Sequence, residues 1–417
     1  MEDQPAQNLT PKSPITGFIE SVVPSRLNAG AKLFLTGALV NGLSNGIFNS
    51  VMQLYLVLMG FSAVELGQMF MFNPLACALL SIPCGIAADR YGKRKMLYLG
   101  FAAVVVGISL FIFADTIPWF ATAFFMFGIS NAASTVMTPL YTSFYEKHDM
   151  EKALGLFGLL NIAAMSLGSL AGYIPIYLIS KAAFTEYSSY RIVMIMGSLL
   201  FVVQYVFYIA SANGLEEKLK DGFQFKLNSW KPVMKFSALA LFGNIAGGML
   251  FSLFPYYVYQ KFRVDSAGLG TLFFLSNLSM ALSKGVAASI AKKLGNMKSI
   301  IVGLVFSSVF FFLMPLSPSF GLLSLLYVLR SGTRFMSDPI LTSLFMKSIS
   351  EDEQSTANSI RMISLNGGGV VSPWLGGTLM ETVSLDFPAF LGAGLTVVMA
   401  ALYPILLSRE INESKEA

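Results

Sequence analysis

Charged residues are scarce in this chain of 417 residues. Asp, Glu, Lys and Arg make up 12% of it, whereas hydrophobic residues make up 55% and the mean hydropathy is +0.65. Soluble domains carry about 25% charged residues. The low charge therefore excludes an ordinary soluble protein of two or three domains and predicts a polytopic membrane protein.

Cysteine and histidine are almost absent as well. Cys77 and Cys84 are the two cysteines, and His148 is the one histidine. On one helix the two cysteines would lie about 10 Å apart along the axis, which is too far for a disulfide. Without a Cys and His cluster or a nucleotide-binding loop, we expect no metal site, no cofactor and no enzyme activity. The net charge of +5 follows from basic loops at the membrane surface and indicates no nucleic-acid partner.

Long apolar runs fill most of the chain instead. A helix needs about 20 apolar residues to cross the hydrocarbon core of a membrane. Twelve runs approach or exceed that length, and we predict that each forms a transmembrane helix. They cover residues 33–59, 66–88, 96–114, 119–144, 153–179, 192–211, 233–259, 269–291, 300–316, 322–345, 358–380 and 389–407.

Polar segments divide these runs into two sets of six. Residues 138–143 (TPLYTS) match residues 338–343 (DPILTS) at a shift of 200, which indicates two related halves. The N-terminal tail is either a surface-lying amphipathic helix or disordered. We predict a cytoplasmic tail at 1–31, a six-helix bundle at 32–212, a cytoplasmic linker at 213–231, a second six-helix bundle at 232–408 and a cytoplasmic tail at 409–417.

Lysine and arginine are concentrated in alternate loops, and this bias orients the chain. Short loops on the cytoplasmic side of a membrane are enriched in these cations. The loops assigned to the outside hold only Lys181, Arg191, Lys261 and Arg263. We therefore expect a multi-pass protein of the plasma (cytoplasmic) membrane with both termini in the cytoplasm.

The most distinctive segment is the charged loop at residues 85–95 (GIAADRYGKRK), between the second and third runs. Four cations within six residues predict a turn on the cytoplasmic surface. The pattern Gly-x-x-x-Asp-Arg-x-Gly-x-Arg-Lys resembles the signature loop of the major facilitator superfamily of secondary transporters, and we call these residues the signature loop. The matching positions are Gly85, Asp89, Arg90, Gly92, Arg94 and Lys95.

This resemblance implies an all-α fold of twelve transmembrane helices in two pseudo-symmetric six-helix bundles. It also implies a monomer that moves a small solute by rocker-switch alternating access, as a secondary active transporter. In this family the signature loop clamps the cytoplasmic ends of the two halves together when the transporter is open outward. Glu146 and Lys152 lie in the neighbouring cytoplasmic loop and would join this latch. A basic loop that only sets topology is the alternative.

Arg330, Arg334 and Asp338 recur every four residues on one face of the tenth run, around its middle. A charge near the bilayer centre costs at least about 3 kcal/mol, so such residues face a cavity or a partner. Together with Lys284 of the eighth run, if that residue faces inward, they predict a substrate or coupling site. An anionic solute is the simplest ligand. The alternative is a structural pair of Arg334 and Asp338.

The resemblance also implies that the first, fourth, seventh and tenth helices line a central cavity. Uncharged amides on these helices can bind a polar solute or hold helices together. Asp338 is the only carboxylate near the middle of a predicted span, so the coupling ion, whether a proton or another ion, stays open. The amide candidates for substrate contact are Asn41, Asn45, Asn49, Asn131 and Asn244.

Three functions compete on these observations. The first is a carrier of a small organic solute, which the arginines of the tenth run favour. The second is a proton-coupled exporter of drugs or other amphiphiles, for which the 36 Phe and 22 Met would provide an adaptable apolar site. The third is a membrane receptor or sensor without transport, which would be expected to carry a soluble signalling domain. The expected partners are a small-molecule substrate and the lipid bilayer.

Overall fold

The computed structural model describes residues 24, 27–146, 149–213, 227–350 and 353–416. Over these ranges the chain consists of helices and connecting turns, without a β-strand. Three predicted features lie outside the described residues: the possible tail helix within 1–23, His148, and residues 214–226 of the linker.

The helices of the first half often continue across a short break. For example, α3 ends at Phe70, and α4 begins at Phe72. The elements are α2 (Ala29–Leu58), α3 (Ala63–Phe70), α4 (Phe72–Tyr91), α5 (Lys93–Phe113), α6 (Ile117–Ala133), η1 (Ser134–Val136), α7 (Met137–Thr142), α8 (Met150–Ser169), η2 (Leu170–Gly172), α9 (Tyr173–Ala182) and α10 (Glu186–Ser211).

The second half has comparable breaks, one at Ser252 and Leu253 and another at Met336. The break at Met336 corresponds to the 3-10 turn η1 in the first half, in keeping with the sequence repeat. The elements are α11 (Trp230–Phe251), α12 (Phe254–Phe262), α13 (Ser266–Leu294), α14 (Asn296–Leu313), α15 (Phe320–Phe335), α16 (Ser337–Lys347), α17 (Gln354–Thr382) and α18 (Phe387–Glu416).

Local chemistry fixes several of these boundaries. Ser62 and Glu65 form a capping box at the start of α3, in which each side chain accepts a hydrogen bond from the backbone of the other. Gly92 ends α4 with a φ of +99°, and Gly295 ends α13 with a φ of +84°. These angles favour glycine. The signature loop at Gly92 and the turn at Gly295 in the second half therefore have similar backbone geometry.

Nine helical segments of the described chain are long and apolar enough to cross a membrane. The long segments outside this group are α2, α15 with α16, and α17. These three carry Asn, Arg and Asp side chains that line the cavities described below. Polar residues that face a cavity lower the hydropathy of a helix without contacting lipid. The elements are therefore consistent with the twelve predicted crossings.

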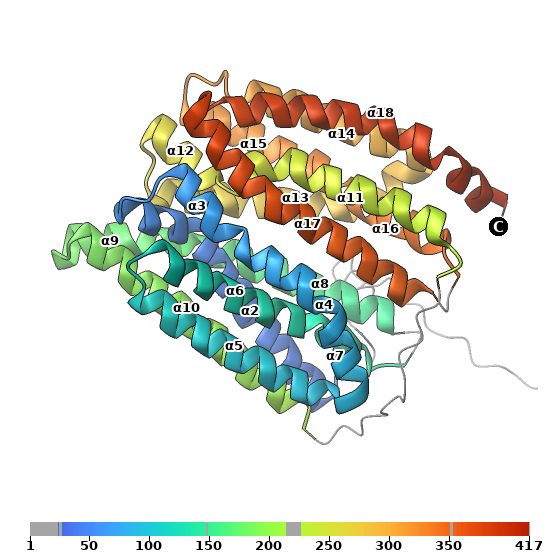
Figure 1. Cartoon of the computed structure of the whole chain (residues 1–417), viewed down its shortest axis with the longest axis horizontal. Coiled ribbons are helices and arrows are strands. Elements are labelled where there is room, and N and C mark those ends of the chain that lie inside the picture. The colour runs from blue at the N-terminus through green and yellow to red at the C-terminus, as the bar shows by residue number, and fades with distance from the viewer. Residues whose placement is uncertain (1–23, 25–26, 147–148, 214–226, 351–352, 417) are drawn as a thin grey trace, which may run out of the picture.

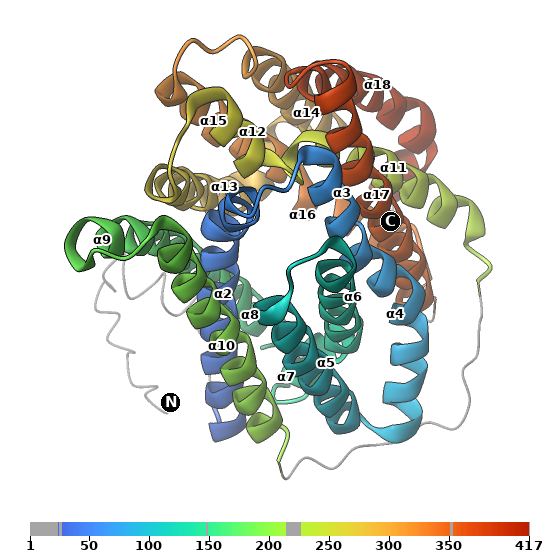
Figure 2. The ribbon, with the colours of Figure 1, turned by 60° about the vertical axis from the view of Figure 1, so that its left-hand side comes forward.

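The helices form two bundles, one from α2–α10 and the other from α11–α18 (Figures 1 and 2). At the end that carries the signature loop, each bundle has its own apolar core. The core of the first bundle includes Ala88 and Tyr141, and that of the second includes Ile300 and Phe345. The two bundles thus have separate interiors at this end.

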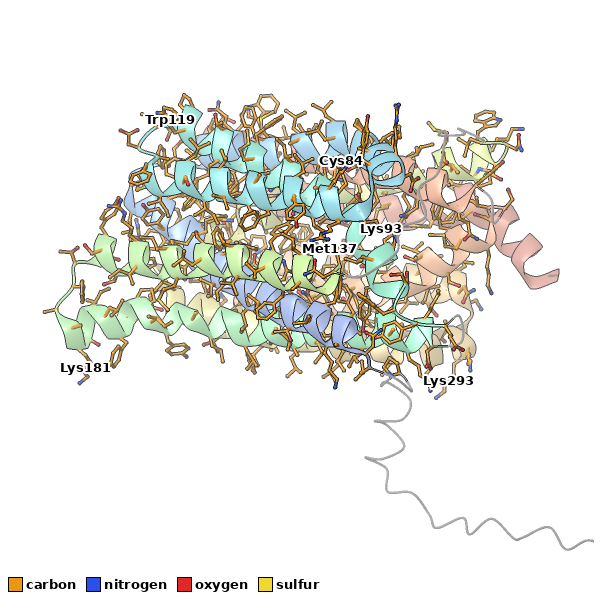
Figure 3. The ribbon with its side chains drawn as sticks, turned by 90° about the horizontal axis from the view of Figure 1, so that it is seen from below. Cys84, Lys93, Trp119, Met137, Lys181 and Lys293 are labelled. Carbon is orange, nitrogen blue, oxygen red and sulfur yellow. The ribbon has the colours of Figure 1, made fainter. Side chains whose placement is uncertain are left out.

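At the opposite end the two bundles share one core. It includes Leu54 and Leu66 from the first half and Leu250 and Leu269 from the second. The halves are consequently joined at one end and separate at the other. Figure 3 shows the two ends: Lys93 and Lys293 lie toward the signature-loop end, and Trp119 and Lys181 lie at the other.

Hydrogen bonds between the halves are found at the joined end. The side chain of Ser266 donates to the carbonyl oxygen of Gly172 at 2.7 Å, and the backbone N–H of Val64 donates to Glu381 at 2.9 Å. Gln53 contacts the backbone of the second half at the break between α11 and α12. We call the contacts of these five residues the inter-half seal.

Candidate functional site

Each half of the molecule contains a cavity lined by polar residues. The second-half cavity has a volume of about 610 Å³, and its charged lining residues are Arg330, Arg334, Asp338 and Arg361. The first-half cavity has a volume of about 500 Å³ and is lined by uncharged residues. The polar chemistry of the two halves is therefore different: cations dominate one cavity, and amides and hydroxyls the other.

Arg334 and Asp338 form an ion pair across the break at Met336. Nη1 of Arg334 lies 2.9 Å from Oδ1 of Asp338. Arg334 is in the last turn of α15, and Asp338 is in the first turn of α16, where the helix dipole favours an anion. The pair that the sequence suggested as a structural alternative is thus present, and it also lines the cavity.

Arg330 has a different environment from Arg334. The residue is only 6% exposed, and its Cζ lies 3.6 Å from the ring centroid of Phe251 and 4.5 Å from that of Phe311. Among the described residues, no group accepts a hydrogen bond from the guanidinium, and its Nε is buried without a partner. The nearby charge that acts on it is Arg334, which has the same sign. Arg330 is therefore a buried cation without an anionic partner.

Arg361 of α17 is a lining residue that the sequence interpretation missed. Its Nη2 lies 3.5 Å from Oδ1 of Asn358, and its Cζ lies 5.2 Å from the ring centroid of Phe345. It also interacts electrostatically with Asp338. Arg361 falls near the start of a predicted run, where a cation is usually an interface residue. Sequence position alone gave no signal of a cavity there.

Lys284 lies apart from this group of arginines. Its Nζ is 5.6 Å from the ring centroid of Phe335, and the residue does not line either cavity. Asn244 does line the second-half cavity, but its side-chain N–H donates to the carbonyl oxygen of Leu365 at 2.6 Å. This hydrogen bond joins α11 to α17. The structure thus brings together Arg330, Arg334 and Asp338 and leaves Lys284 outside.

The amides of α2 form a network in the first-half cavity. Asn41 donates to Oε1 of Gln204 at 2.5 Å and accepts from Asn161 at 3.1 Å. Asn45 donates to the backbone and side-chain oxygens of Asn41. These contacts join α2 to α8 and α10. Gln204 and Asn161 were not among the sequence candidates, although each is an amide within an otherwise apolar run.

Asn49 and Asn131 face the first-half cavity more openly. Asn49 lines the cavity, is exposed, and has no hydrogen bond to a described residue. Asn131 donates to Oδ1 of Asn73 at 3.2 Å and is also exposed. These side chains can contact a solute in the cavity. The lining also contains the rings of five phenylalanines, Phe48, Phe124, Phe127, Phe157 and Phe201, and those of Tyr205 and Tyr208.

The signature loop lies at the separated end of the two halves. Asp89 is exposed and has neither a hydrogen bond nor an ion pair with the described residues. A Cβ atom at Gly85 would meet no heavy atom within 4 Å, so no other helix of the described chain packs there in this conformation.

The cations of the signature loop contact nearby parts of the first half. Arg90 and Lys95 lie 5.5 and 5.8 Å from the ring of Tyr91, and Arg94 donates to the hydroxyl of Tyr98 at 3.2 Å. Glu146 follows α7, and Lys152 is in the first turn of α8. Arg94, Glu146 and Lys152 each have a polar, ring or electrostatic interaction.

Comparison with known proteins decides the family. The sequence model of the Major Facilitator Superfamily matches residues 34–241 and 236–417, which together span nearly the whole chain. The chain belongs to this superfamily. It is therefore a multi-pass membrane transporter, and the predicted all-α fold is confirmed. The resemblance that the signature loop carried identified the same family.

Two relatives illustrate how distant the similarity to individual proteins can be. The multi-drug resistance efflux pump PmrA of Streptococcus pneumoniae is 23% identical over 370 residues, which cover 82% of this chain and 86% of PmrA. The uncharacterized MFS-type transporter MJ1560 of Methanocaldococcus jannaschii is 23% identical over 327 residues, which cover 78% of this chain and 84% of that protein.

Solved structures agree on the fold. A bacterial homologue of the iron transporter ferroportin in its inward-facing state matches this structure with a TM-score of 0.73 at 13% sequence identity. The match covers 92% of this chain and all of that one, 100%. At such low identity the likeness shows a shared fold and says nothing of the substrate. The substrate class has to be inferred from the chemistry of the cavities.

Proposed function

We propose that this transporter carries a small organic anion across the plasma membrane by rocker-switch alternating access. The observation that supports this most directly is the buried guanidinium of Arg330, which lines the second-half cavity and has no acceptor among the described residues. Taking a cation out of water costs several kcal/mol unless an anion compensates. A negatively charged solute in the cavity provides that compensation.

The charge of the whole second-half cavity supports the same proposal. Its ionised lining groups are three arginines and one aspartate, which leaves a surplus of two positive charges. Arginine is the side chain best suited to bind carboxylate or phosphate oxygens, because its N–H donors form a planar fork. A cationic solute would be repelled from this cavity.

The arrangement of the halves supports an inward-open conformation. The inter-half seal closes one end, and the end that carries the signature loop has two separate cores. Lysine and arginine are enriched in short cytoplasmic loops, which supports a cytoplasmic position for the signature loop and both termini. In this proposal the protein is a monomer, and the latch formed by Asp89 and its neighbours engages only when the cytoplasmic end closes.

Asp338 is the group we propose for coupling transport to a second ion. Neither cavity has another carboxylate among its described lining residues. A substrate anion that binds Arg334 would compete with Asp338 for the same guanidinium. The released carboxylate could then accept a proton from water or bind another cation, so that substrate and ion move together. Transport would be secondary active.

Reconstituted full-length protein provides the test. Purified protein is screened by thermal shift against benzoate, succinate, inorganic phosphate, glucose and ethidium, and the stabilising compounds are then tested for counterflow in vesicles. We expect stabilisation and saturable counterflow with an anion, and loss of both in an Arg334→Gln variant. Absence of binding by every anion in the panel would contradict the proposal. If Arg334→Gln bound the anion with wild-type affinity and transported it at the wild-type rate, Arg334 would have a structural role only.

A proton-coupled exporter of amphiphiles is the second candidate. The observation that favours it is the aromatic lining of the first-half cavity, which includes Phe48, Phe124 and Phe201. The similarity to the efflux pump PmrA agrees with it. The same screen separates the two functions, because an amphiphile exporter would be stabilised by ethidium and not by benzoate or succinate.

A further inference from the structure

The environment of Arg330 is specific enough to indicate the head group of the substrate. Its Cζ and the ring centroids of Phe251 and Phe311 form a triangle with sides of 3.6, 4.5 and 4.9 Å. The two rings are tilted by 44° to each other. The N–H donors of arginine lie in the plane of the group. Those of Arg330 have no acceptor among the described residues.

The other arginines of the second-half cavity already interact with an anion. Arg334 is paired with Asp338 at 2.9 Å, and Arg361 also interacts with this carboxylate. Asp338 has no comparable interaction with Arg330. The carboxylate of Asp338 therefore interacts with two of the three arginines of this cavity. Arg330 is the third, and it has no carboxylate of the described chain nearby. A single carboxylate of the substrate would fill that place.

Room in front of Arg330 is provided by Gly247 of α11. A Cβ atom at Gly247 would lie 3.6 Å from Nη2 of Arg330. The missing side chain leaves this nitrogen open to the second-half cavity, which Gly247 and Arg330 both line. The donor edge is thus accessible although the residue as a whole is buried.

The linings of the two cavities approach each other at α17. Gly369 of α17 lies between them: a Cβ atom there would be 3.2 Å from Pro74 and 3.5 Å from Nδ2 of Asn244. Asn244 lines the second-half cavity, and Asn73, which precedes Pro74, lines the first-half cavity. In the inference below, the body of a solute held at Arg330 extends past Gly369 toward the amides and rings of the first half.

We propose that the substrate is a monocarboxylate with an uncharged body that contains hydrogen-bonding groups and an aromatic or similar apolar surface. The carboxylate binds the edge of Arg330 in the second half, and the body contacts Asn49 and the phenylalanines of the first-half cavity. This inference rests on the proposed function, because it specifies which organic anion the transporter carries.

Hippurate is a suitable probe because it joins a carboxylate, an amide and a phenyl ring. Hippuramide replaces the carboxylate with a neutral amide, and N-acetylglycine removes the ring. With purified full-length wild-type protein, we expect hippurate to bind at least about tenfold more tightly than either relative, as measured by isothermal titration calorimetry. Equal binding of hippurate and hippuramide would overturn the proposal. This comparison needs no variant and does not depend on how a substituted protein folds.

Variants then test the position of the carboxylate. Arg330→Gln should weaken hippurate binding at least about tenfold, because it removes a charge-assisted bidentate contact. Arg330→Lys should retain part of the affinity, since the charge remains but the planar fork is lost. The matched control is Arg191→Gln: Arg191 also lies over an aromatic ring, 6.0 Å from that of Tyr187, and lines neither cavity. Its binding should stay within about twofold of wild type.

The outcomes distinguish this inference from the proposed function. If Arg330→Gln binds hippurate like wild type while Arg361→Gln does not, the carboxylate binds elsewhere in the cavity. The inference is then wrong, but transport of an organic anion stands. If wild-type protein binds none of hippurate, benzoate, succinate and phosphate, the proposed function itself fails.

Discussion

The side-chain amide of Gln53 in the first half takes the place of a missing backbone hydrogen bond beside Ser252 in the second half. In a regular helix the N–H of Tyr256 would donate to the carbonyl oxygen of Ser252. At the break between α11 and α12, Nε2 of Gln53 instead donates to that oxygen at 2.8 Å, and Oε1 of Gln53 accepts from the N–H of Tyr256 at 3.2 Å. The break is therefore satisfied only when the two halves meet.

Replacing Gln53 with Ala should weaken the inter-half seal. Two backbone groups would lose their partners, and each buried hydrogen bond contributes about 1 kcal/mol. We expect the ratio of open to closed protein at this end to rise roughly thirtyfold, seen by double electron–electron resonance between labels in loops 59–62 and 383–386. Asn366→Ala is the control, because Asn366 bonds only within its own helix, to Met362. A distance distribution that does not change in Gln53→Ala would show that the amide does not hold the seal.

Close backbone packing across the seal provides a second prediction. A Cβ atom at Gly270 would clash with the carbonyl oxygen of Ser169 in the other half, whereas one at Gly285 would meet nothing within 4 Å. Both glycines are in α13, so alanine raises helix propensity by about 1 kcal/mol at each. Comparing Gly270→Ala with Gly285→Ala therefore distinguishes the effect of the steric clash from the effect of helix propensity.

We expect Gly270→Ala to shift the protein toward the conformation open at the sealed end, and Gly285→Ala to leave the equilibrium unchanged. The same labels report on both variants. A Gly270→Ala protein with the wild-type distance distribution would mean that α13 and η2 can separate slightly without opening. We also expect the melting temperature of Gly285→Ala to equal or exceed that of wild type, because this variant gains helix propensity without a clash.

The resemblance and the polar residues of the sequence predicted the fold and part of the site. The charged loop identified the family, and the regular spacing of Arg330, Arg334 and Asp338 identified a helix face that does line a cavity. These features are local in sequence, so that periodicity is enough to recognise them. The three long segments outside the group of nine apolar spans, α2, α15 with α16, and α17, each contribute polar side chains to a cavity.

Contacts between segments that are distant along the chain could not be predicted from the sequence. Arg361 joins the cavity only because α17 packs beside α11, and Lys284 is left out because α13 presents it to Phe335. Asn41 is occupied by Gln204, which comes 163 residues later. Nothing in the spacing of one helix reveals which neighbour satisfies its polar groups.

Glu353 provides a prediction on pH dependence at the signature-loop end. This buried side chain precedes α17, and its carboxylate accepts hydrogen bonds from the backbone N–H groups of Asn228 at 2.7 Å and Ser229 at 2.9 Å. These bonds, which lie at the start of α11, lower the pKa of Glu353 below its ordinary value. Because the folded-state pKa is the lower one, the stabilisation is complete above the ordinary pKa of glutamate and is lost as the pH falls through the lowered one.

Glu353→Gln should therefore lower the melting temperature at pH 7, and the difference from wild type should shrink as the pH falls below the ordinary range of a glutamate. Melting curves of purified protein between pH 7 and pH 3 measure this. Glu186→Gln is the control, because Glu186 is exposed at the start of α10. If the melting temperatures of wild type and Glu353→Gln differed by the same amount at every pH, the effect would come from altered packing and not from the charge of Glu353.

The last prediction concerns Asp89 of the signature loop. Asp89 is exposed and has no ion pair with the described residues, so Asp89→Asn should leave the melting temperature of this conformation nearly unchanged. If the signature loop latches the closed cytoplasmic end, the same change should reduce the population in which residues 143–146 and 348–350 approach each other, as measured by double electron–electron resonance. Asp115→Asn, at the exposed turn before α6 on the far end, is the control. An unchanged distance distribution in Asp89→Asn would leave the loop with a role in topology alone.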